Sequence, residues 1–342
     1  MEESPPQSSI PPWVKKFVPI IVSILILYYY FHDQDWNKLA EAAGKANLII
    51  AVLAILIPQL IFWFCEVLIT DRHMTWFHGP FDWRSFTWVR GAIYFLILVN
   101  PALGGGGVYI YLQRKTKMTW SKLMGIALFR FGLTIWGITI LLIPATLLMH
   151  YYGMAEKAKI NMWVWWAFLI FGVVWCIEAW IVWHYNKDFG LSKIVVRDRN
   201  SEFWTAFRTA TKRQWYLTWA IGVPPFLFML IGFYFLTRAF DINVPFLHFI
   251  VVAPLAMAIM DAPIAFAGFG TTTLAWVLFF GEYGSTGNIA ACSLFLPFAR
   301  ASIRALIGVV SLKPAIGDIS DLSSVRASDE EPTTSSAENE KT

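Results

Sequence analysis

The sequence predicts an all-α polytopic membrane protein with about six full transmembrane helices and two re-entrant broken hairpins, arranged as an inverted repeat. The 342-residue chain is 57% hydrophobic and only 15% charged, and several of its apolar runs are long enough to cross a bilayer. Two further apolar stretches are interrupted by proline and glycine. Basic residues gather in two connections between the runs, and this asymmetry indicates how the runs must cross.

The N-terminal end is expected to lie in the cytoplasm. Residues 1–13 are acidic and rich in proline, unlike the basic start of a cleaved signal peptide. We therefore expect a disordered segment followed by an apolar run that is retained as a membrane anchor. Lys15 and Lys16 assign this end to the cytoplasm by the positive-inside rule.

Full spans are predicted wherever an apolar run is long enough to cross the hydrocarbon core. The runs that satisfy this lie at about 14–31, 48–70, 123–149, 162–184, 215–237 and 288–311. Two other apolar stretches, 86–112 and 246–281, contain the interruptions.

The first interruption follows the polar residue Asn100 and combines Pro101 with a run of glycines. These glycines are Gly104, Gly105, Gly106 and Gly107. Each glycine costs about 0.8–1.0 kcal/mol relative to alanine inside a helix, so the run predicts a break in the helix.

The second interruption repeats this composition with Asp261, Pro263, Gly268 and Gly270. Broken backbone at membrane depth is tolerated where protein buries it or where it lines a wet cavity. Two breaks in corresponding places indicate the binding site of a transporter. The alternative is a helical bundle whose glycines only allow close packing.

The charge of the connections indicates whether each interrupted stretch crosses the membrane once or enters it and returns. The connections 113–122 and 185–214 are strongly basic, and both should be cytoplasmic. A single crossing by 86–112 would place 113–122 outside, whereas entry and return at the glycines places it inside. Treating 246–281 in the same way puts the C-terminal end in the cytoplasm.

The resulting order of elements repeats. Residues 14–149 form one membrane repeat and residues 162–311 a second one, which must be inverted because each contains an odd number of full spans. Residues 312–342 are rich in Ser, Asp, Glu and Thr and are expected to form a disordered cytoplasmic tail.

Arginines inside the apolar sequence are the first candidates for substrate contact. Arg130 lies in the span after the first break, and Arg300 and Arg304 lie in the span after the second. A guanidinium is always charged and its planar fork suits phosphate, so these residues could receive an anionic lipid headgroup. The alternative is structural pairing, of Arg130 with Glu66 or of Arg300 with Asp261.

Acidic residues inside the apolar sequence are candidates for proton coupling. Glu66, Glu178 and Asp261 are costly in the membrane, and a carboxyl group in a low-dielectric site takes up a proton more readily. For Glu66, near the end of its span, pairing or snorkelling is the favoured interpretation.

The sequence motifs do not support a nucleotide-binding, catalytic or metal site. Gly268-Phe269-Gly270 is not a dinucleotide fingerprint, because no βαβ unit surrounds it. The run Gly104–Gly107 lacks the Lys-Ser/Thr of a phosphate-binding loop. We expect no catalytic residue, no metal, no cofactor and no nucleic-acid partner.

Two blocks of the chain resemble a known family. The first is Pro101–Gly107, followed by basic residues at 114–117 and by Arg130; the second is Pro263–Gly270, followed by Arg300 and Gly308. This pattern is similar to the flippase-like domain family, also called the lysylphosphatidylglycerol synthase transmembrane region (MprF- and YbhN-like proteins). The resemblance extends over roughly residues 15–315.

The resemblance implies a lipid flippase of the bacterial inner membrane, with membrane lipids as partners and without the aminoacyl-transferase domain of the synthases. Its substrate would be an anionic or modified phospholipid. Phe129 and Phe131 flank Arg130, where the family pattern often has an acidic residue, so the substrate is expected to differ from an aminoacylated lipid.

Two other functions stay open at this point. One is a membrane enzyme acting on a lipid-linked substrate, with Asp261 or Glu178 as acid or base. The other is a scaffold whose partners are lipid-synthesis enzymes.

Overall fold

The computed structural model describes residue 28 and residues 36–99, 101–153, 162–185, 190, 196, 198–260 and 269–329 of the chain. Every regular element within these residues is a helix, which confirms the all-α prediction. The predicted span 14–31 and the N-terminal residues 1–13 lie outside the described residues.

The first half of the chain is a series of helices joined by short connections. They are α2 (Trp36–Lys45), α3 (Leu48–Phe77), α4 (Trp83–Val99), α5 (Pro101–Thr116) and α6 (Trp120–Tyr151). The long helices begin at capping residues, because the Asn47 side chain accepts a hydrogen bond from the Ile50 N–H and the Thr119 side chain accepts one from the Lys122 N–H.

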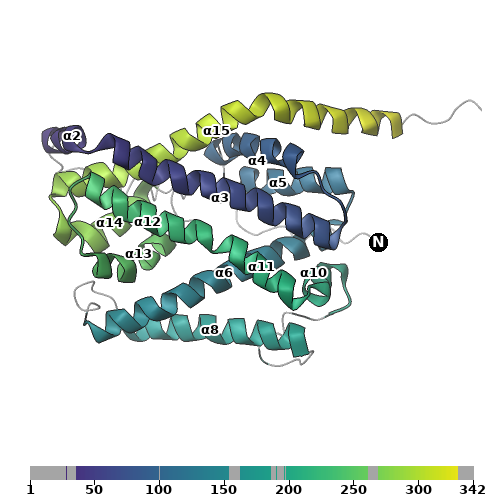
Figure 1. Cartoon of the computed structure of the whole chain (residues 1–342), viewed down its shortest axis with the longest axis horizontal. Coiled ribbons are helices and arrows are strands. Elements are labelled where there is room, and N and C mark those ends of the chain that lie inside the picture. The colour runs from purple at the N-terminus through teal and green to yellow at the C-terminus, as the bar shows by residue number, and fades with distance from the viewer. Residues whose placement is uncertain are drawn as a thin grey trace, which may run out of the picture.

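The second half begins with α8 and ends with a helix that extends beyond the body of the molecule (Figure 1). Its elements are α8 (Met162–Tyr185), η1 (Glu202–Trp204), α10 (Thr205–Thr209), α11 (Lys212–Gly222), α12 (Pro224–Ala239), α13 (Phe246–Met260), α14 (Phe269–Phe280), η3 (Gly281–Tyr283) and α15 (Thr286–Asp329). A capping box between Thr211 and Gln214 starts α11, and Pro224 opens α12 at a position where a missing N–H costs nothing.

Three stretches are long and apolar enough to cross a membrane. They are Leu48–Phe77, Lys212–Ala239, which joins α11 to α12, and Thr286–Gly317 within α15. Helices α6 and α8, of 32 and 24 residues, occupy two more of the predicted spans. The complete set of six spans stays a prediction.

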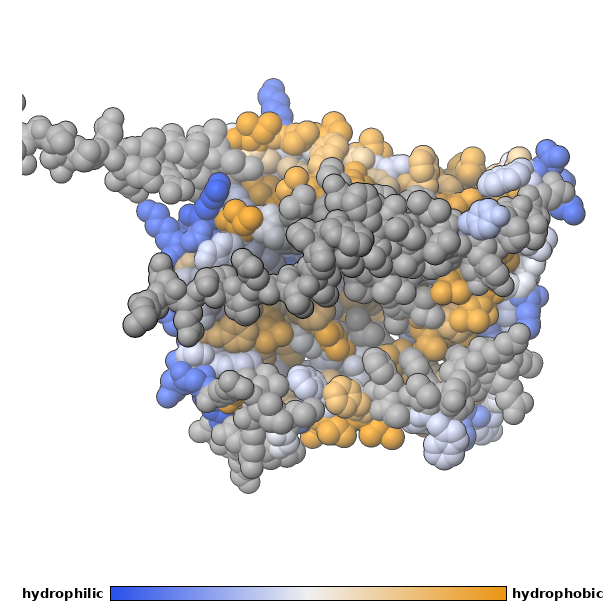
Figure 2. All heavy atoms as spheres, turned by 180° about the vertical axis from the view of Figure 1, so that it is seen from behind, coloured by the Kyte–Doolittle hydropathy of each residue, from blue (hydrophilic) through white to orange (hydrophobic). Residues whose placement is uncertain are grey.

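The surface agrees with a membrane environment. On α3, Ile49 is 74% exposed and Phe64 is 61% exposed, as side chains that face lipid would be. Figure 2 shows apolar residues over much of the visible body, with most of the hydrophilic residues near its two ends.

Helices α4 and α5 form a hairpin whose turn lies between Val99 and Pro101. The two helices pack against each other. Since α4 has 17 residues and rises about 25 Å, it is shorter than a hydrocarbon core of about 30 Å. This length supports the re-entrant interpretation, which stays a prediction.

The predicted break is present at the start of its block, since α4 ends at Val99 and α5 begins at Pro101, but the assignment of the turn to the glycines was wrong. The glycine run lies inside α5 and is helical. The reason is close packing, since a methyl group on Gly104 would lie 2.1 Å from Ile97 Cγ1 of α4, and one on Gly107 would lie 3.2 Å from Leu96 Cδ1. Gly104 and Gly107 therefore let α5 approach α4, in agreement with the alternative interpretation of close packing.

The second hairpin has a similar outline. Helices α13 and α14 pack on each other. The Thr271 hydroxyl of α14 donates a hydrogen bond to the Met260 carbonyl at the end of α13, at 3.2 Å. The chain therefore returns on itself between Met260 and Phe269. The predicted break residues Asp261, Pro263 and Gly268 lie outside the described residues.

Helix α15 lies along α4, and this pairing also depends on small residues. A methyl group on Gly91 would lie 2.1 Å from Ser311 Oγ, and one on Gly308 would lie 2.6 Å from Phe95 Cδ2. Close approach of this kind is typical of helix pairs in membranes.

The predicted tail, 312–342, begins as helix, because α15 continues to Asp329. The sequence explains this continuation, since Ile316, Ile319, Leu322 and Val325 are spaced by three residues and no proline or glycine lies between Gly317 and the end of α15 at Asp329.

The connection between α5 and α6 and the described residues 198–211 of the second basic connection lie at one end of the molecule (Figure 1). Thr119 donates a hydrogen bond to Glu202, and a methyl group on Gly125 would lie 1.7 Å from the Phe203 carbonyl oxygen, so the start of α6 packs against the segment before α10. Their shared position agrees with the predicted topology. The inverted repeat itself stays a prediction.

Candidate functional site

Glu66 of α3 lies between two arginines from two other helices. Its carboxylate accepts a hydrogen bond from Arg90 Nη2 of α4 and one from Arg130 Nη2 of α6, the latter at 2.8 Å. The side chains of Glu66, Arg90 and Arg130 are only 14%, 9% and 23% exposed. The predicted pairing of Arg130 with Glu66 is therefore present, but Glu66 is shared with a second arginine.

Thr70 supports the same ion pair from one turn further along α3. Its hydroxyl accepts a hydrogen bond from Arg130 Nη1 at 3.3 Å and donates one to the Glu66 carbonyl at 2.8 Å. Residues four apart share a helix face, so Glu66 and Thr70 both present oxygen to Arg130.

Tyr94 connects this ion pair to α15. The Arg90 guanidinium lies 4.6 Å from the centroid of the Tyr94 ring, and the Arg304 guanidinium lies 5.8 Å from it. The Tyr94 hydroxyl accepts a hydrogen bond from Gln59 Nε2 at 3.3 Å. The ring therefore lies between two cations that originate more than 200 residues apart.

We call Arg90, Arg130 and Arg304, with Glu66 and Tyr94, the arginine cluster. Among the described residues, Glu66 is the one carboxylate in ionic contact with these guanidinium groups. Arg90 Nη1 and Arg304 Nε are buried and have no hydrogen-bond partner within the described part of the chain. The cluster thus has more positive than negative charge, together with donors that are available to an acceptor.

Arg300 and Arg304 separate although they are four residues apart on α15. Arg300 Nη2 contacts Met229 Sδ at 2.9 Å, and its guanidinium lies 5.1 Å from the centroid of the Phe233 ring, both on α12. Arg300 therefore points towards α12, whereas Arg304 points towards α4. The predicted pair of Arg300 with Asp261 falls on a residue outside the described ones.

The predicted glycines play different parts. Gly104 and Gly107 face α4, whereas Gly105 and Gly106 have open space beside them. Gly270 is buried at the start of α14. Asn100, predicted as a polar contact at the first break, lies outside the described residues.

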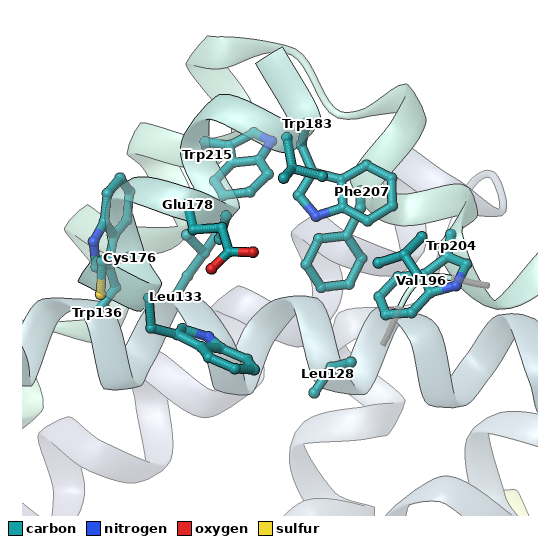
Figure 3. A pocket seen from close by; sticks show the side chains of 14 residues that line it. Leu128, Leu133, Trp136, Cys176, Glu178, Trp183, Val196, Trp204, Phe207 and Trp215 are labelled. Atoms are coloured by element: carbon teal, nitrogen blue, oxygen red, sulfur yellow. The ribbon is translucent and has the colours of Figure 1, made fainter. Parts of the chain in front are cut away.

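Glu178 lies away from the arginine cluster, in a cavity of about 140 Å³ between α6, α8 and α11 (Figure 3). It is 6% exposed. The two acidic candidates for proton coupling that the structure describes, Glu66 and Glu178, thus lie in separate parts of the molecule.

Sequence reasoning missed Arg90, Tyr94 and Gln59. Arg90 lies near the start of the apolar stretch 86–112, beside Gly91, and such a position is easily read as the flank of a hydrophobic segment. The available signal was the spacing of Arg90 and Tyr94 by four residues, which places them on one helix face.

Comparison with known proteins identifies the family of the chain. The lysylphosphatidylglycerol synthase TM region family matches residues 16–302. The chain belongs to this family. Its match covers the two hairpins, Glu66, Arg90, Arg130 and Arg300, and it ends just before Arg304.

Membership of the lysylphosphatidylglycerol synthase TM family indicates a membrane protein with a lipid-related role. A comparison with curated proteins gives no match.

Proposed function

We propose that this protein moves a phospholipid with an anionic or modified polar headgroup across the bacterial inner membrane, and that it is not itself an enzyme. The observation that carries the proposal is the buried excess of guanidinium charge in the arginine cluster. A charged residue inside a membrane protein is costly and marks a substrate path by default.

A phospholipid would supply the negative charge and the hydrogen-bond acceptors that the arginine cluster lacks. Its phosphate brings negative charge and several acceptor oxygens, which match the planar N–H fork of an arginine. Arg90 already uses one nitrogen for Glu66, so its buried Nη1 and the Nε of Arg304 are the donors left for a phosphate oxygen. Tyr94 between them gives an aromatic surface on which both cations rest.

The proposal includes a path for the headgroup through the first hairpin. Helices α4 and α5 have 17 and 16 residues, near the lower limit for crossing a bilayer, and α4 contributes both Arg90 and Tyr94. We infer that this hairpin is re-entrant and that a headgroup would reach the arginine cluster beside it from one leaflet, as with the broken segments of transporters.

Reconstitution tests the proposal directly. The full chain is placed in liposomes with fluorescent phosphatidylglycerol, phosphatidylethanolamine or an isoprenoid phosphate, and movement between leaflets is followed by quenching from outside. We expect movement of at least one of these lipids by the wild-type chain. Arg304→Gln should abolish most of that movement, because it removes a donor without leaving a carboxylate unpaired.

Matched variants separate function from folding. Arg84 is exposed on α4, the helix that carries Arg90, so Arg84→Gln is expected to transport normally. Arg304→Lys keeps the charge but not the fork, and should restore only part of the movement. A folded Arg304→Gln protein that transports like the wild type would contradict the proposal and favour a scaffold.

A further inference from the structure

The arginine cluster carries an excess of two positive charges. Its cations are the three guanidinium groups of Arg90, Arg130 and Arg304, which are always protonated, and its one anion is the Glu66 carboxylate. Arg90 and Arg130 both bind that carboxylate, so within the described part of the chain Arg304 has no anionic partner. Buried charges are stable when they are paired, and the cluster therefore lacks two negative charges.

The uncompensated charge is concentrated around the Tyr94 ring, which is 1% exposed. The Arg90 guanidinium lies 4.6 Å from the centroid of this ring and the Arg304 guanidinium lies 5.8 Å from it. An aromatic ring attracts a cation at such a distance, but the ring carries no net charge and cannot neutralise the cation. Tyr94 thus holds guanidinium groups of α4 and α15 near each other and leaves their charge to be compensated by a ligand.

Hydrogen-bond donors are also left over at this place. Arg90 Nη1 and Arg304 Nε are buried and donate to no described residue. The Arg90 side chain is only 9% exposed, so bulk water does not supply the missing acceptor. A buried donor without an acceptor is costly, more so when it is charged. A ligand that stabilises the cluster therefore has to bring several acceptor oxygens as well as negative charge.

A phosphate monoester matches the missing charge and the missing acceptors better than a phosphodiester does. A monoester carries about −1.5 to −2 charges at pH 7 and presents three terminal oxygens. Positive charge nearby favours its doubly ionised form, which would neutralise the excess of the cluster. A phosphodiester, such as that of phosphatidylglycerol, carries about one negative charge. It would leave one buried guanidinium group without an anionic partner.

We propose that the arginine cluster selects a lipid phosphate monoester, carried by a diacylglycerol or by an isoprenoid chain, over a phosphodiester lipid. This inference rests on the proposed function, because it names the substrate class of the same site. The selection is one of charge, since Arg304 supplies the positive charge that a diester does not need. The preference for a monoester should therefore disappear when the charge of Arg304 is removed.

Binding of soluble headgroup analogues tests the selection without any transport step. Glycerol 3-phosphate, a monoester, is compared with glycerophosphoglycerol, a diester, by calorimetry on the purified full chain at about pH 7.5. We expect the monoester to bind at least about tenfold more tightly, as one more charge-assisted contact would produce. Equal or tighter binding of the diester would overturn the proposal.

The pH dependence of this preference is an independent test on the wild-type chain. A monoester loses its second proton at about pH 6, whereas a diester keeps the same charge, so the ratio of the two affinities should rise between about pH 5 and pH 7.5. Protonation of the protein acts on both ligands and largely cancels in the ratio. The charged and titratable groups at the cluster are Glu66, His73, Arg90, Tyr94, Tyr109, Arg130 and Arg304. A ratio that does not change with pH would contradict selection by charge.

Variants of Arg304 separate charge from geometry. Arg304→Gln should reduce the preference for the monoester to less than about twofold, whereas Arg304→Lys keeps the charge and should keep the preference at a lower affinity. Arg84→Gln, at an exposed position of α4, should bind both analogues like the wild type. If Arg304→Gln does not fold, Arg304→Lys and the pH profile of the wild type decide. An unchanged preference in folded Arg304→Gln would overturn the proposal.

Transport in liposomes identifies the lipid that carries the phosphate. Fluorescent phosphatidic acid and a fluorescent isoprenoid phosphate are compared with fluorescent phosphatidylglycerol. Faster movement of either monoester supports the proposal and identifies its carrier. Faster movement of phosphatidylglycerol overturns the proposal but leaves lipid transport in place. Preferential binding of glycerol 3-phosphate without movement of any lipid supports selection at the cluster and overturns the proposed function alone.

Discussion

The arginine cluster and the cavity around Glu178 share helix α6 but differ in the side chains that surround them. In the cluster, two guanidinium groups bind the Glu66 carboxylate and a third, that of Arg304, lies against the Tyr94 ring. The cavity is lined mainly by apolar and aromatic side chains, with Glu178 among them. The difference shows that a buried charge in this protein has to be interpreted with the helices that pack around it.

The largest expected effect tests the ionic half of this contrast. Glu66→Ala should destabilise the protein by about 3–5 kcal/mol, because two buried guanidinium groups lose their carboxylate. Unfolding in detergent followed by tryptophan fluorescence measures this. Glu41→Ala, which breaks an exposed pair with Lys45 on α2, should change stability by at most about 0.5 kcal/mol. Equal losses of stability in the two variants would show that Glu66 does not stabilise the arginine cluster.

Ligand stabilisation should test whether the arginine cluster binds a phosphate group. Glycerol 3-phosphate at 100 times its dissociation constant should stabilise the wild-type protein by about 2.7 kcal/mol. Arg304→Gln should lose this effect and Arg84→Gln should keep it, as measured by the unfolding midpoint. Equal stabilisation of the Arg304→Gln protein would show that Arg304 does not contact the ligand.

A smaller effect tests the packing that brings α4 and α5 together. Gly104→Ala should destabilise by about 1–3 kcal/mol, because its methyl group would lie 2.1 Å from Ile97 Cγ1. Gly105→Ala, at the next residue, meets open space and should stabilise by up to about 1 kcal/mol. The same unfolding assay compares them, and opposite signs are the expected result. Stabilisation by both would show that Gly104 is not needed for the close approach of α5 to α4.

The smallest expected change in stability concerns the hydrogen bond from Arg130 to Thr70. Thr70→Val keeps the side-chain volume but removes the acceptor for Arg130 Nη1, so stability should fall by about 1 kcal/mol. Thr87, exposed on α4, bonds only to its own helix, and Thr87→Val should be nearly neutral. A loss above 3 kcal/mol in Thr70→Val would mean that Thr70 supports the ion pair more directly than its 3.3 Å contact indicates.

The sequence alone determined the membrane class, the helical fold and most helix positions. These depend on local properties, namely apolar length, capping residues and the charge of the connections, and α3, α12 and α15 lie close to where those properties placed them. The family resemblance also followed from local blocks around Pro101 and Arg300, and the family match bears it out.

The tertiary structure alone decided which charges meet. Glu66 contacts Arg90 and Arg130, which are 24 and 64 residues away in the chain, and such contacts depend on how helices pack rather than on any local pattern. The same holds for Gly104, because only packing places it against Ile97 of the neighbouring helix, where a larger side chain would not fit. Sequence supplied the charged and small residues of this protein, and helix packing determined which of them became an ionic cluster, which a close contact and which a side chain in the lining of a mainly apolar cavity.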